Sequence, residues 1–551
     1  MRYDQYGKKP TEPGEPTEPT DPTDPTDPTE PSEPTDPSEP TEPAVRIRPD
    51  VWKLDPWDPT IEWYARAIAE MRTRSLDDPS GWRFQAAIHA YNRSGDPYAA
   101  PGDTLPSSGD QQRFWNQCQH SSWYFLPWHR MYLGHFEAIV AQTVEQLGGP
   151  SGWSLPYWNY SDDSNPDARR IPPAFREPTL PDGTTPNPLR VSQRVAAANS
   201  GGIVADPAEV DIVDALDETV FVGTAFGGTT GFGGPQTAFN HGGGPPGKLE
   251  MTPHGDVHVA VGGSFPPGFM SRFNTAGLDP LFWLHHANID RMWSVWLARA
   301  PGNANPSENA WKQSPTFEFH DAAGQVVGMT SEEVVDSTSS PFFYRYEDES
   351  DPLATPAPSA AVAAAAAAAG EEVEMTQEPA EMVAASDEKT RLRGRAVTTR
   401  VAVESPIRTR RAPRGAAAAA PGPPQRIHLN LENIRGTHPV PHRVYIDLPE
   451  GADPDDHPER LAGTVSMFGL AEASGEDQEH PGSGLQYALD ITRLVEALGE
   501  EWDPEELRVT LVPKQRPAEA PPGAEAAAAP AAEAAEHPTI EIGRISVYRT
   551  P

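Results

Sequence analysis

Apolar and polar residues follow a helical period early in the chain and a strand period near its end. The stretches Ile61–Arg74 and Trp82–Asn92 carry apolar residues at helical spacing, and the stretch from Ser121 continues as a helix to about Leu147. From about Gln425, the segments RIHLNLENI, HRVYIDLPEG, LAGTVSMFGLAE and LRVTLVPKQ alternate apolar and polar residues as strands do. The pattern predicts a mainly α-helical domain followed by an all-β domain of the sandwich or jelly-roll kind.

Two low-complexity segments flank the helical domain. Residues 1–43 repeat Thr or Ser, Asp or Glu, and Pro, a composition that favours extended polyproline II and lacks the apolar residues of a core. Residues 352–423 are rich in Ala, Pro and Glu, with a basic island at 389–414. We predict a disordered acidic tail at 1–43, the helical domain at 44–351, a protease-sensitive Ala/Pro-rich linker at 352–423 and the β domain at 424–551.

Composition and charge narrow the function classes. The 551 residues include 43 basic and 80 acidic side chains, and this net charge of -37 argues against binding to nucleic acid or to an anionic membrane. The first residues, MRYDQYGKKPTEP, lack the apolar region of a secretory signal, and the Ala-rich run from Ala361 is too short to span a bilayer. We expect a soluble protein, cytoplasmic as the sequence is written, with export by another route left open. The single cysteine, Cys118, excludes an internal disulfide framework.

Histidines gather in the segment that runs from 247 to 295. His254 and His258 are four residues apart and therefore lie on one face of a helix, and the pair His285 and His286 follows some thirty residues later, with Asp290 one helical turn beyond. Buried imidazole has a polar edge that a core must satisfy at a cost, so such a group is better explained as metal ligands than as core residues. The segment predicts a metal site with three nitrogen ligands and a nearby carboxylate.

An upstream segment has the same composition. His89 lies near the end of a predicted helix, and the stretch NQCQHSSWYFLPWHRMYLGHFE contains His120, His129 and His135. Three imidazoles from this half could form a second metal site beside the first.

The motifs HSSWYFLPWHRMYLGHFE, PHGDVHVAVGG and DPLFWLHHANIDRMW resemble the tyrosinase and catechol oxidase family of type-3 dicopper proteins, in particular the plant-type polyphenol oxidases. The resemblance implies a helical bundle that holds two copper ions and an o-diphenol:oxygen oxidoreductase. Such an enzyme oxidises two catechols to o-quinones for each O2, which leaves as water. The C-terminal part resembles the domain that covers the active site of plant polyphenol oxidases in their latent form, so we expect an intramolecular shield.

The resemblance also assigns the metal ligands. Six histidines match the family's ligand positions, three for each copper: His89, His120 and His129, and His254, His258 and His286. In the family's His-His pair the second residue is the ligand. Since neighbouring helix positions point about 100° apart, both members could not easily face one metal, and His285 is expected only to support the site. His135 and His241 match no ligand position.

Three further residues are candidates for a catalytic role. Glu250 matches an acidic residue that helps to hold a water in the family, and Phe273 matches a bulky residue above the coppers. Asp290 could accept an N–H near the ligands, pair with an arginine such as Arg291, or form a purely structural salt bridge. Efficient monophenol hydroxylases often have Asn where this chain has Gly255, so the resemblance favours catechol oxidation over phenol hydroxylation.

A covalent feature of the family is missing at its usual place. The cysteine that commonly forms a thioether with the second histidine of the first site lies just after the first histidine, where this chain has Asn92 and Arg93. Cys118 is two residues from His120, and a cross-link at that spacing would be strained. We expect Cys118 to be a buried or partly exposed thiol.

Three alternatives remain at this point. The same six histidines would serve a haemocyanin-like oxygen-binding protein without turnover, or more distantly a zinc hydrolase. The β domain could instead bind carbohydrate or a protein partner and have no part in latency. If it is a shield, Met467 or Phe468 is the candidate plug, and the sequence does not choose between them.

Overall fold

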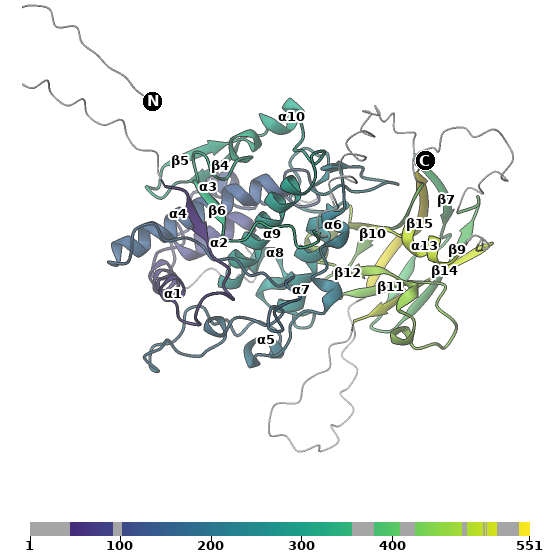
Figure 1. Cartoon of the computed structure of the whole chain (residues 1–551), viewed down its shortest axis with the longest axis horizontal. Helices are drawn as coiled ribbons and strands as arrows, with labels where there is room; N and C mark the ends of the chain where they lie inside the picture. The colour runs from purple at the N-terminus through teal and green to yellow at the C-terminus, as the bar shows by residue number, and fades with distance from the viewer. Residues whose placement is uncertain are drawn as a thin grey trace, which may run out of the picture. The chain divides into compact units, whose positions relative to one another are not determined.

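The computed structural model describes residues 44–91, 102–354, 380–407, 425–475, 482–499, 502, 504–514 and 539–550. The predicted tail at 1–43 lies outside these residues, as do Asn92 and Arg93. In the part that is described, a helical domain is followed by a β domain, which confirms the predicted fold class (Figure 1).

The helical domain is built around two long helices, α4 and α9, which pack against each other in its centre (Figure 1). A π-helical turn at Glu250–Gly255 leads directly into α7. The α-helices of this domain are α1 Pro59–Met71, α2 Trp82–His89, α3 Ser108–Phe114, α4 Phe125–Gln146, α5 Ala196–Ser200, α6 Val213–Leu216, α7 Asp256–Gly262, α8 Phe273–Ala276, α9 Pro280–Arg299 and α10 Asn309–Lys312.

Local sequence explains where the long helices begin and end. The Asp279 side chain caps α9 by accepting from the N–H of Leu281, and Pro280 fits the first turn because its missing N–H needs no partner there. Helix α4 ends at Gln146, shortly before a Gly-Gly-Pro sequence at 148–150 that favours the end of a helix. Nearly every side chain of both helices is buried, so they form the core of the domain rather than its surface.

The β domain is a single antiparallel sheet of nine strands. Its order is β12-β11-β14-β9-β7-β15-β10-β13, with β8 paired to β15, and the end strands β12 and β13 approach each other, so the sheet is nearly closed. The strands are β7 Glu381–Ala385, β8 Thr390–Leu392, β9 Val397–Val403, β10 Arg426–Arg435, β11 His442–Ile446, β12 Leu461–Val465, β13 Leu485–Asp490, β14 Glu506–Pro513 and β15 Ile540–Thr550. Two short helices, α12 Leu470–Ser474 and α13 Thr492–Ala497, complete the domain.

The predicted boundary at 424 is wrong, because three of these strands lie in the segment interpreted as a linker. Strand β9 pairs with β14 over Val397–Ala402, and β7 and β8 both pair with β15. The β domain therefore starts at Glu381, and part of the basic island belongs to strands rather than to an exposed tether. The local composition of this segment did not indicate strands, because these strands pair with β14 and β15, which lie more than a hundred residues away in the sequence.

Smaller sheets complete the helical domain. Strand β1 (Arg46–Arg48) pairs in parallel with β6 (Tyr344–Tyr346), which joins the two ends of the domain. The other pairs are β2 Val222–Gly223 with β3 Gly234–Pro235, and β4 Phe317–His320 with β5 Val326–Met329.

Candidate metal centre

The structure brings all six sequence-predicted histidine ligands into one buried cluster. His89 ends α2, His129 lies in the second turn of α4, and His120 lies in the irregular segment before α4. His254, His258 and His286 come from the π-helical turn, α7 and α9. Each side chain is at most 2% exposed.

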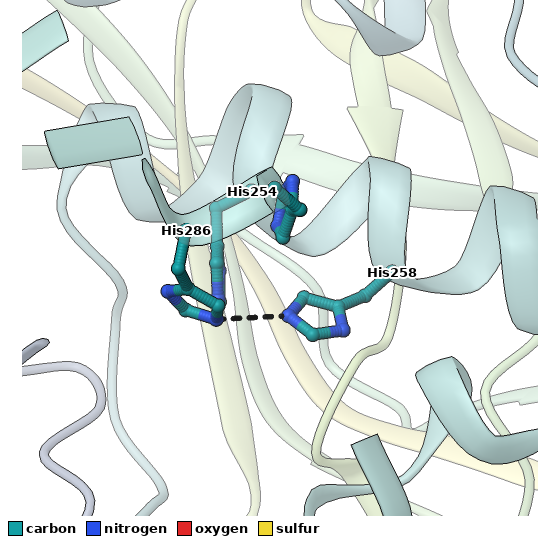
Figure 2. Close-up of side chains that lie close together, drawn as sticks. His254, His258 and His286 are labelled. Atoms are coloured by element: carbon teal, nitrogen blue, oxygen red, sulfur yellow. Dashed lines mark hydrogen bonds between the residues drawn. The ribbon is translucent and has the colours of Figure 1, made fainter. Parts of the chain in front are cut away.

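The cluster contains the two sets of three histidines predicted from the sequence, with no gap between the sets: His89, His129 and His286 also offer nitrogens within 4.8 Å of one another. The rings of His89, His120 and His129 lie 5.2–5.8 Å apart by centroid, and those of His254, His258 and His286 lie 4.6–5.5 Å apart. The His129 and His286 rings stack at 4.4 Å and link the groups. Figure 2 shows the second group, in which the Nε2 atoms of His258 and His286 are 3.4 Å apart.

Main-chain carbonyls orient four of the six rings. The Nδ1 atoms of these rings lie 2.7–3.1 Å from the carbonyl oxygens of Phe273, Phe125, Glu250 and Met270, for His89, His129, His254 and His258 respectively. This bond places the proton on Nδ1 and leaves Nε2 as an acceptor. Among the described residues, the Nε2 atoms of His89, His129 and His254 have no hydrogen-bond partner although they are buried. Such buried nitrogens fit a metal ion.

His285 departs from the expectation drawn from helical geometry. Its ring centroid lies 4.7 Å from that of His258 and 5.4 Å from that of His254, and its ring nitrogens have no hydrogen-bond partner among the described residues. His254, His258, His285 and His286 together offer nitrogens that all lie within 4.8 Å of one another.

Burial keeps the cluster neutral. Loss of solvent lowers the pKa of all six imidazoles, and the neighbouring rings lower most of them further. For His129 the pKa falls to about 3. Neutral imidazole is the form that binds copper or zinc, so the cluster is ready to coordinate without losing protons.

Glu250 lies at the edge of the cluster with a protonated carboxyl group. Burial raises its pKa from 4.5 to about 8, even though the N–H of Ser121 donates to its two oxygens at 2.8 and 2.9 Å. Glu250 lines a small void of about 20 Å³ together with His254, Gly255, Ser466 and others. That volume has room for about one water molecule beside the carboxyl group.

Phe273 contacts the cluster in two ways. Its ring stacks on that of His120 at 4.2 Å, and its carbonyl oxygen is the partner of His89 Nδ1. The residue therefore packs against the first histidine group, and its place above the coppers stays a prediction.

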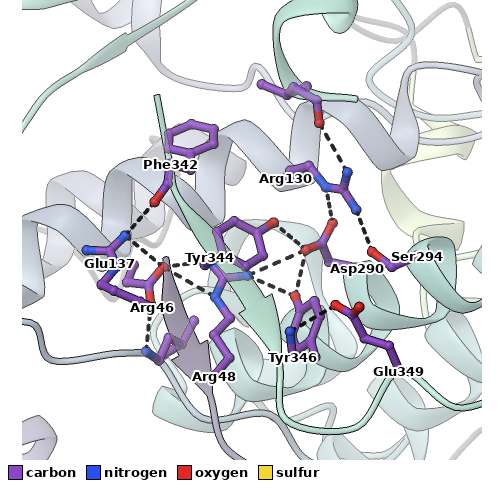
Figure 3. Close-up of polar contacts among 12 residues, drawn as sticks. Arg46, Arg48, Arg130, Glu137, Asp290, Ser294, Phe342, Tyr344, Tyr346 and Glu349 are labelled. Atoms are coloured by element: carbon purple, nitrogen blue, oxygen red, sulfur yellow. Dashed lines mark hydrogen bonds and ion pairs between the residues drawn. The ribbon is translucent and has the colours of Figure 1, made fainter. Parts of the chain in front are cut away.

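Asp290 lies away from the ring nitrogens and belongs to a buried ion-pair network (Figure 3). It accepts from Arg130 at 2.6 Å and from the hydroxyls of Tyr344 and Tyr346 at 2.5 and 2.6 Å, with Arg48 at 3.5 Å. Burial alone would raise the pKa of Asp290, but the two arginines hold it below its ordinary value. Of the roles considered from sequence, the structural salt bridge fits these contacts.

Arg291, the partner suggested from sequence, is directed elsewhere. It donates to the carbonyl of Asp348 at 2.6 Å and to Asn288 at 3.0 Å. Tyr344 and Tyr346 are buried, and both donate hydrogen bonds to Asp290. Residues before the helical domain's first helix, such as Arg48, carry no sequence signal for this network because their partners lie far along the chain.

The β domain contributes one aromatic side chain to the cluster. The Phe468 ring stacks on that of His258 at 4.0 Å and 11°, and lies 4.7 Å from the ring of Phe273. Met467 is instead buried in the core of the β domain. Of the two plug candidates, Phe468 is therefore the one that meets the histidines.

Cys118 and His241 lie beside the first group. Cys118 is fully buried, and its Sγ is 3.1 Å from Nδ1 of His241. His241 was predicted to be a surface or structural residue, and it is buried.

Comparison with known proteins places this cluster in a family. Residues 79–199 and 207–299 match the common central domain of tyrosinase. Over 489 residues the chain is 35% identical to a tyrosinase from Hahella sp. (strain CCB-MM4), which covers 86% of this chain and 96% of that protein. The chain belongs to the tyrosinase family.

Plant enzymes are also among the relatives. A chloroplastic polyphenol oxidase from Malus domestica is 26% identical over 326 residues, and the chain spans about half of it (50%). The structure of latent apple tyrosinase aligns with a TM-score of 0.56 at 22% identity, over 92% of this chain and 98% of that one. Latent aurone synthase aligns with a TM-score of 0.58 at 21% identity, over 93% and 91%. These likenesses confirm the fold, the β domain included.

Membership of the tyrosinase family makes this chain a type-3 copper oxidoreductase for phenolic substrates and O2. Residues 379–550 match a domain of unknown function, whose start agrees with strand β7 rather than with the boundary predicted at 424. In the described part of the chain, no helix combines the length and the apolar character that crossing a membrane requires.

Proposed function

We propose that this tyrosinase-family protein is a latent catechol oxidase. In this proposal His89, His120 and His129 hold one copper, and His254, His258 and His286 hold the other. The observation that carries it is the buried cluster of six neutral imidazoles, four of them oriented by carbonyls, with Phe468 stacked on one ring. Two bound coppers would exchange electrons with O2, so that two catechols become o-quinones and O2 becomes water.

The chain's own residues would bind and orient the substrate. The Phe273 ring stacks on His120 and the adjacent Phe468 ring stacks on His258, so Phe468 would have to withdraw before a catechol could reach the His258 ring. Once inside, the substrate ring would stack on His258 as Phe468 does. Stacking of this kind contributes about 0.5–1.5 kcal/mol beyond area burial.

Glu250 would serve as the proton acceptor of the site. A carboxyl group with a pKa of about 8 is partly ionised near neutral pH, where a general base is most effective. The adjoining void would let one water carry a proton from a hydroxyl of the substrate to the Glu250 carboxylate.

Gly255 is the reason for favouring catechols over monophenols. A Cβ at this position would lie 2.8 Å from Oγ of Ser466 and 3.7 Å from Cβ of Phe468. In the protein from which the β domain has been cleaved, we expect Gly255→Asn to raise the rate of monophenol hydroxylation. In the intact chain, we expect the larger side chain to displace the shield. Rates with a simple phenol and a simple catechol, before and after cleavage, measure both effects. An unchanged phenol-to-catechol ratio after cleavage contradicts the role given to Gly255.

Oxygen uptake by the copper-loaded intact chain tests the proposal as a whole. We expect little uptake with a simple catechol in the wild type and at least tenfold more in Phe468→Ala, which opens the space over His258. Phe226→Ala removes an aromatic ring that is 56% exposed and is the matched control, with uptake as low as in the wild type. His258→Ala combined with Phe468→Ala should bind about one copper fewer and show no uptake.

Two outcomes would count against the proposal. If Phe468→Ala binds two coppers and oxygen reversibly but turns over no catechol, the haemocyanin-like alternative is favoured. If zinc rather than copper saturates the chain, the oxidase assignment fails.

A further inference from the structure

The His120 ring has no hydrogen bond that anchors it among the described residues. Neither of its ring nitrogens has a partner, whereas a carbonyl holds Nδ1 in four of the other five rings, and Nε2 of the fifth, His286, lies 3.4 Å from Nε2 of His258. His120 also lies outside any helix, and the next residue, Ser121, has a left-handed backbone with φ of 50°. The backbone that bears this imidazole therefore contributes to its position, together with packing contacts such as the stacked ring of Phe273.

Asn240 holds that backbone from both sides. The N–H of His120 donates to the carbonyl of Asn240 at 2.9 Å, and Nδ2 of Asn240 donates back to the carbonyl of His120 at 2.7 Å. Nδ2 also lies 3.3 Å from the carbonyl of Ser121 and 3.0 Å from that of Gly243. The N–H of Asn240 donates to the side chain of Gln119 at 3.0 Å. One residue thus binds the main chain or side chain of three consecutive positions, 119 to 121.

The same short segment supplies a hydrogen bond to the proposed base. The N–H of Ser121 donates to both oxygens of Glu250, and Oγ of Ser121 donates to the carbonyl of Gly244 at 3.1 Å. A shift of this segment would therefore move the His120 ring and the partner of Glu250 together. Sγ of Cys118 lies 3.1 Å from Nδ1 of His241 and within 4.8 Å of a ring nitrogen of His120, so the Asn240 bonds hold a backbone segment that has a thiol close to its imidazole.

We propose that Asn240 is the positioning residue for His120. Its side-chain amide and its carbonyl fix the peptide groups on either side of His120, and this fixes the imidazole where the first group of three ligands is completed. The inference rests on the proposed function, because it takes His120 to be a copper ligand. Asn240 lies more than a hundred residues from His120 in sequence, in a Gly-rich stretch that resembles a plain surface loop.

Copper titration of the intact chain tests the role. In Asn240→Ala the loss of an outer partner should weaken the first copper about 10- to 100-fold and leave the second unchanged. Competition with a chelator should then show one tight and one weak copper per chain instead of two tight ones. The remaining Cu(II) has no neighbour to couple with, so its electron paramagnetic resonance signal should rise. A merely unstable protein would lose both coppers together.

Two further variants keep the test independent of folding. Asn240→Asp keeps the size of the side chain but cannot donate to the carbonyl of His120, and we expect the same selective loss. Asn199→Ala is the matched control, since Nδ2 of Asn199 donates to the carbonyl of Val191 at 2.8 Å in another part of the domain. It should bind both coppers as the wild type does.

The outcomes separate this inference from the proposed function. If the wild type binds two coppers and both Asn240 variants do so with wild-type affinity, the role of Asn240 is overturned and the function stands. An intact mass lower by two hydrogens would point to a thioether as the element that holds His120, and would also overturn it. If the wild type takes up no copper, both proposals fail.

Discussion

At the scale of single residues, burial decides the chemistry of this site. The six imidazoles lose solvent and stay neutral, and Glu250 loses solvent and stays protonated to about pH 8. Both effects favour the uncharged form: the first leaves ring nitrogens free to bind a metal, and the second gives the Glu250 carboxyl a pKa at which it can exchange a proton near neutral pH. The sequence identifies these residues as candidates, but their protonation states depend on burial, which arises from packing between segments far apart in the chain.

The raised pKa of Glu250 predicts a pH dependence of stability. Its pKa is 4.5 ordinarily and about 8 in the folded chain, so folding takes up a proton between these values. Stability should therefore fall as pH rises through this window, by up to about 1.4 kcal/mol per pH unit. Glu250→Gln removes the titrating group, so its stability relative to the wild type should increase from pH 5 to pH 8.

Unfolding midpoints of the copper-free wild type and Glu250→Gln at several pH values measure the effect. The histidines are the same in both proteins, so their contribution to the pH dependence drops out of the difference. Glu145→Gln changes an exposed carboxyl of α4 and serves as control. If the difference between wild type and Glu250→Gln stays constant over this range, the carboxyl is not protonated in the folded chain.

At the scale of elements, buried charges join the two helices that carry the ligands. Arg130 follows His129 on α4, and Asp290 lies one turn after His286 on α9, so their ion pair at 2.6 Å fixes one helix against the other. Strands β1 and β6 add Arg48 and the two tyrosines (Figure 3). The network holds the helices and contacts none of the six ring nitrogens.

Removal of Asp290 should destabilise the helical domain strongly. Asp290→Ala leaves Arg130, which is 1% exposed, without its main partner, and the expected cost is about 3–5 kcal/mol. The exposed pair of Glu62 and Arg66 provides the comparison, because Glu62→Ala should cost only about 0.3–0.5 kcal/mol. Urea unfolding followed by tryptophan fluorescence gives both values, and a similar cost for the two variants would show that the network contributes little.

At the scale of the whole molecule, each domain packs a side chain against the core of the other. Phe468 of the β domain packs in the core of the helical domain, whereas Met251 of the helical domain packs against the core of the β domain. Ion pairs also join the two domains. Lys514 of the β domain, for example, pairs with Asp206 and Glu209 of the helical domain at 2.6 and 2.8 Å. Release of the shield must therefore break apolar and charged contacts at once.

The strand pairing predicts which cleavage activates the protein. A protease site inserted in 355–379 severs the helical domain from the entire sheet, so we expect oxygen uptake to rise once the fragments separate. A site inserted in 408–424 leaves β7, β8 and β9 paired with β14 and β15, so the fragments should co-elute and the uptake should stay low. Size-exclusion chromatography and oxygen uptake after cleavage measure both. Equal activation by the two cuts would contradict this account of the sheet.

Sequence alone predicted the six candidate ligands, and it determined the helical period of the first domain and the strand period of the second. These are local properties: His254 and His258 share a helix face because of spacing, and their chemistry follows from their side chains. Phe273 could be predicted to lie above the ligands from its motif in the same way. None of these required knowledge of a distant partner.

Only the tertiary structure decided the features that depend on distant partners. In the structure, His285 lies close to the second histidine group, and Asp290 binds Arg130 and the two tyrosines. Phe468 rather than Met467 contacts the histidines, and strands lie in a segment whose composition is typical of a linker. The tertiary structure also brought Asn240 to both sides of His120. The physical reason is the same for all of these features, because each depends on contacts between segments far apart in the sequence. A local pattern of residues carries no information about which distant segment will pack against it.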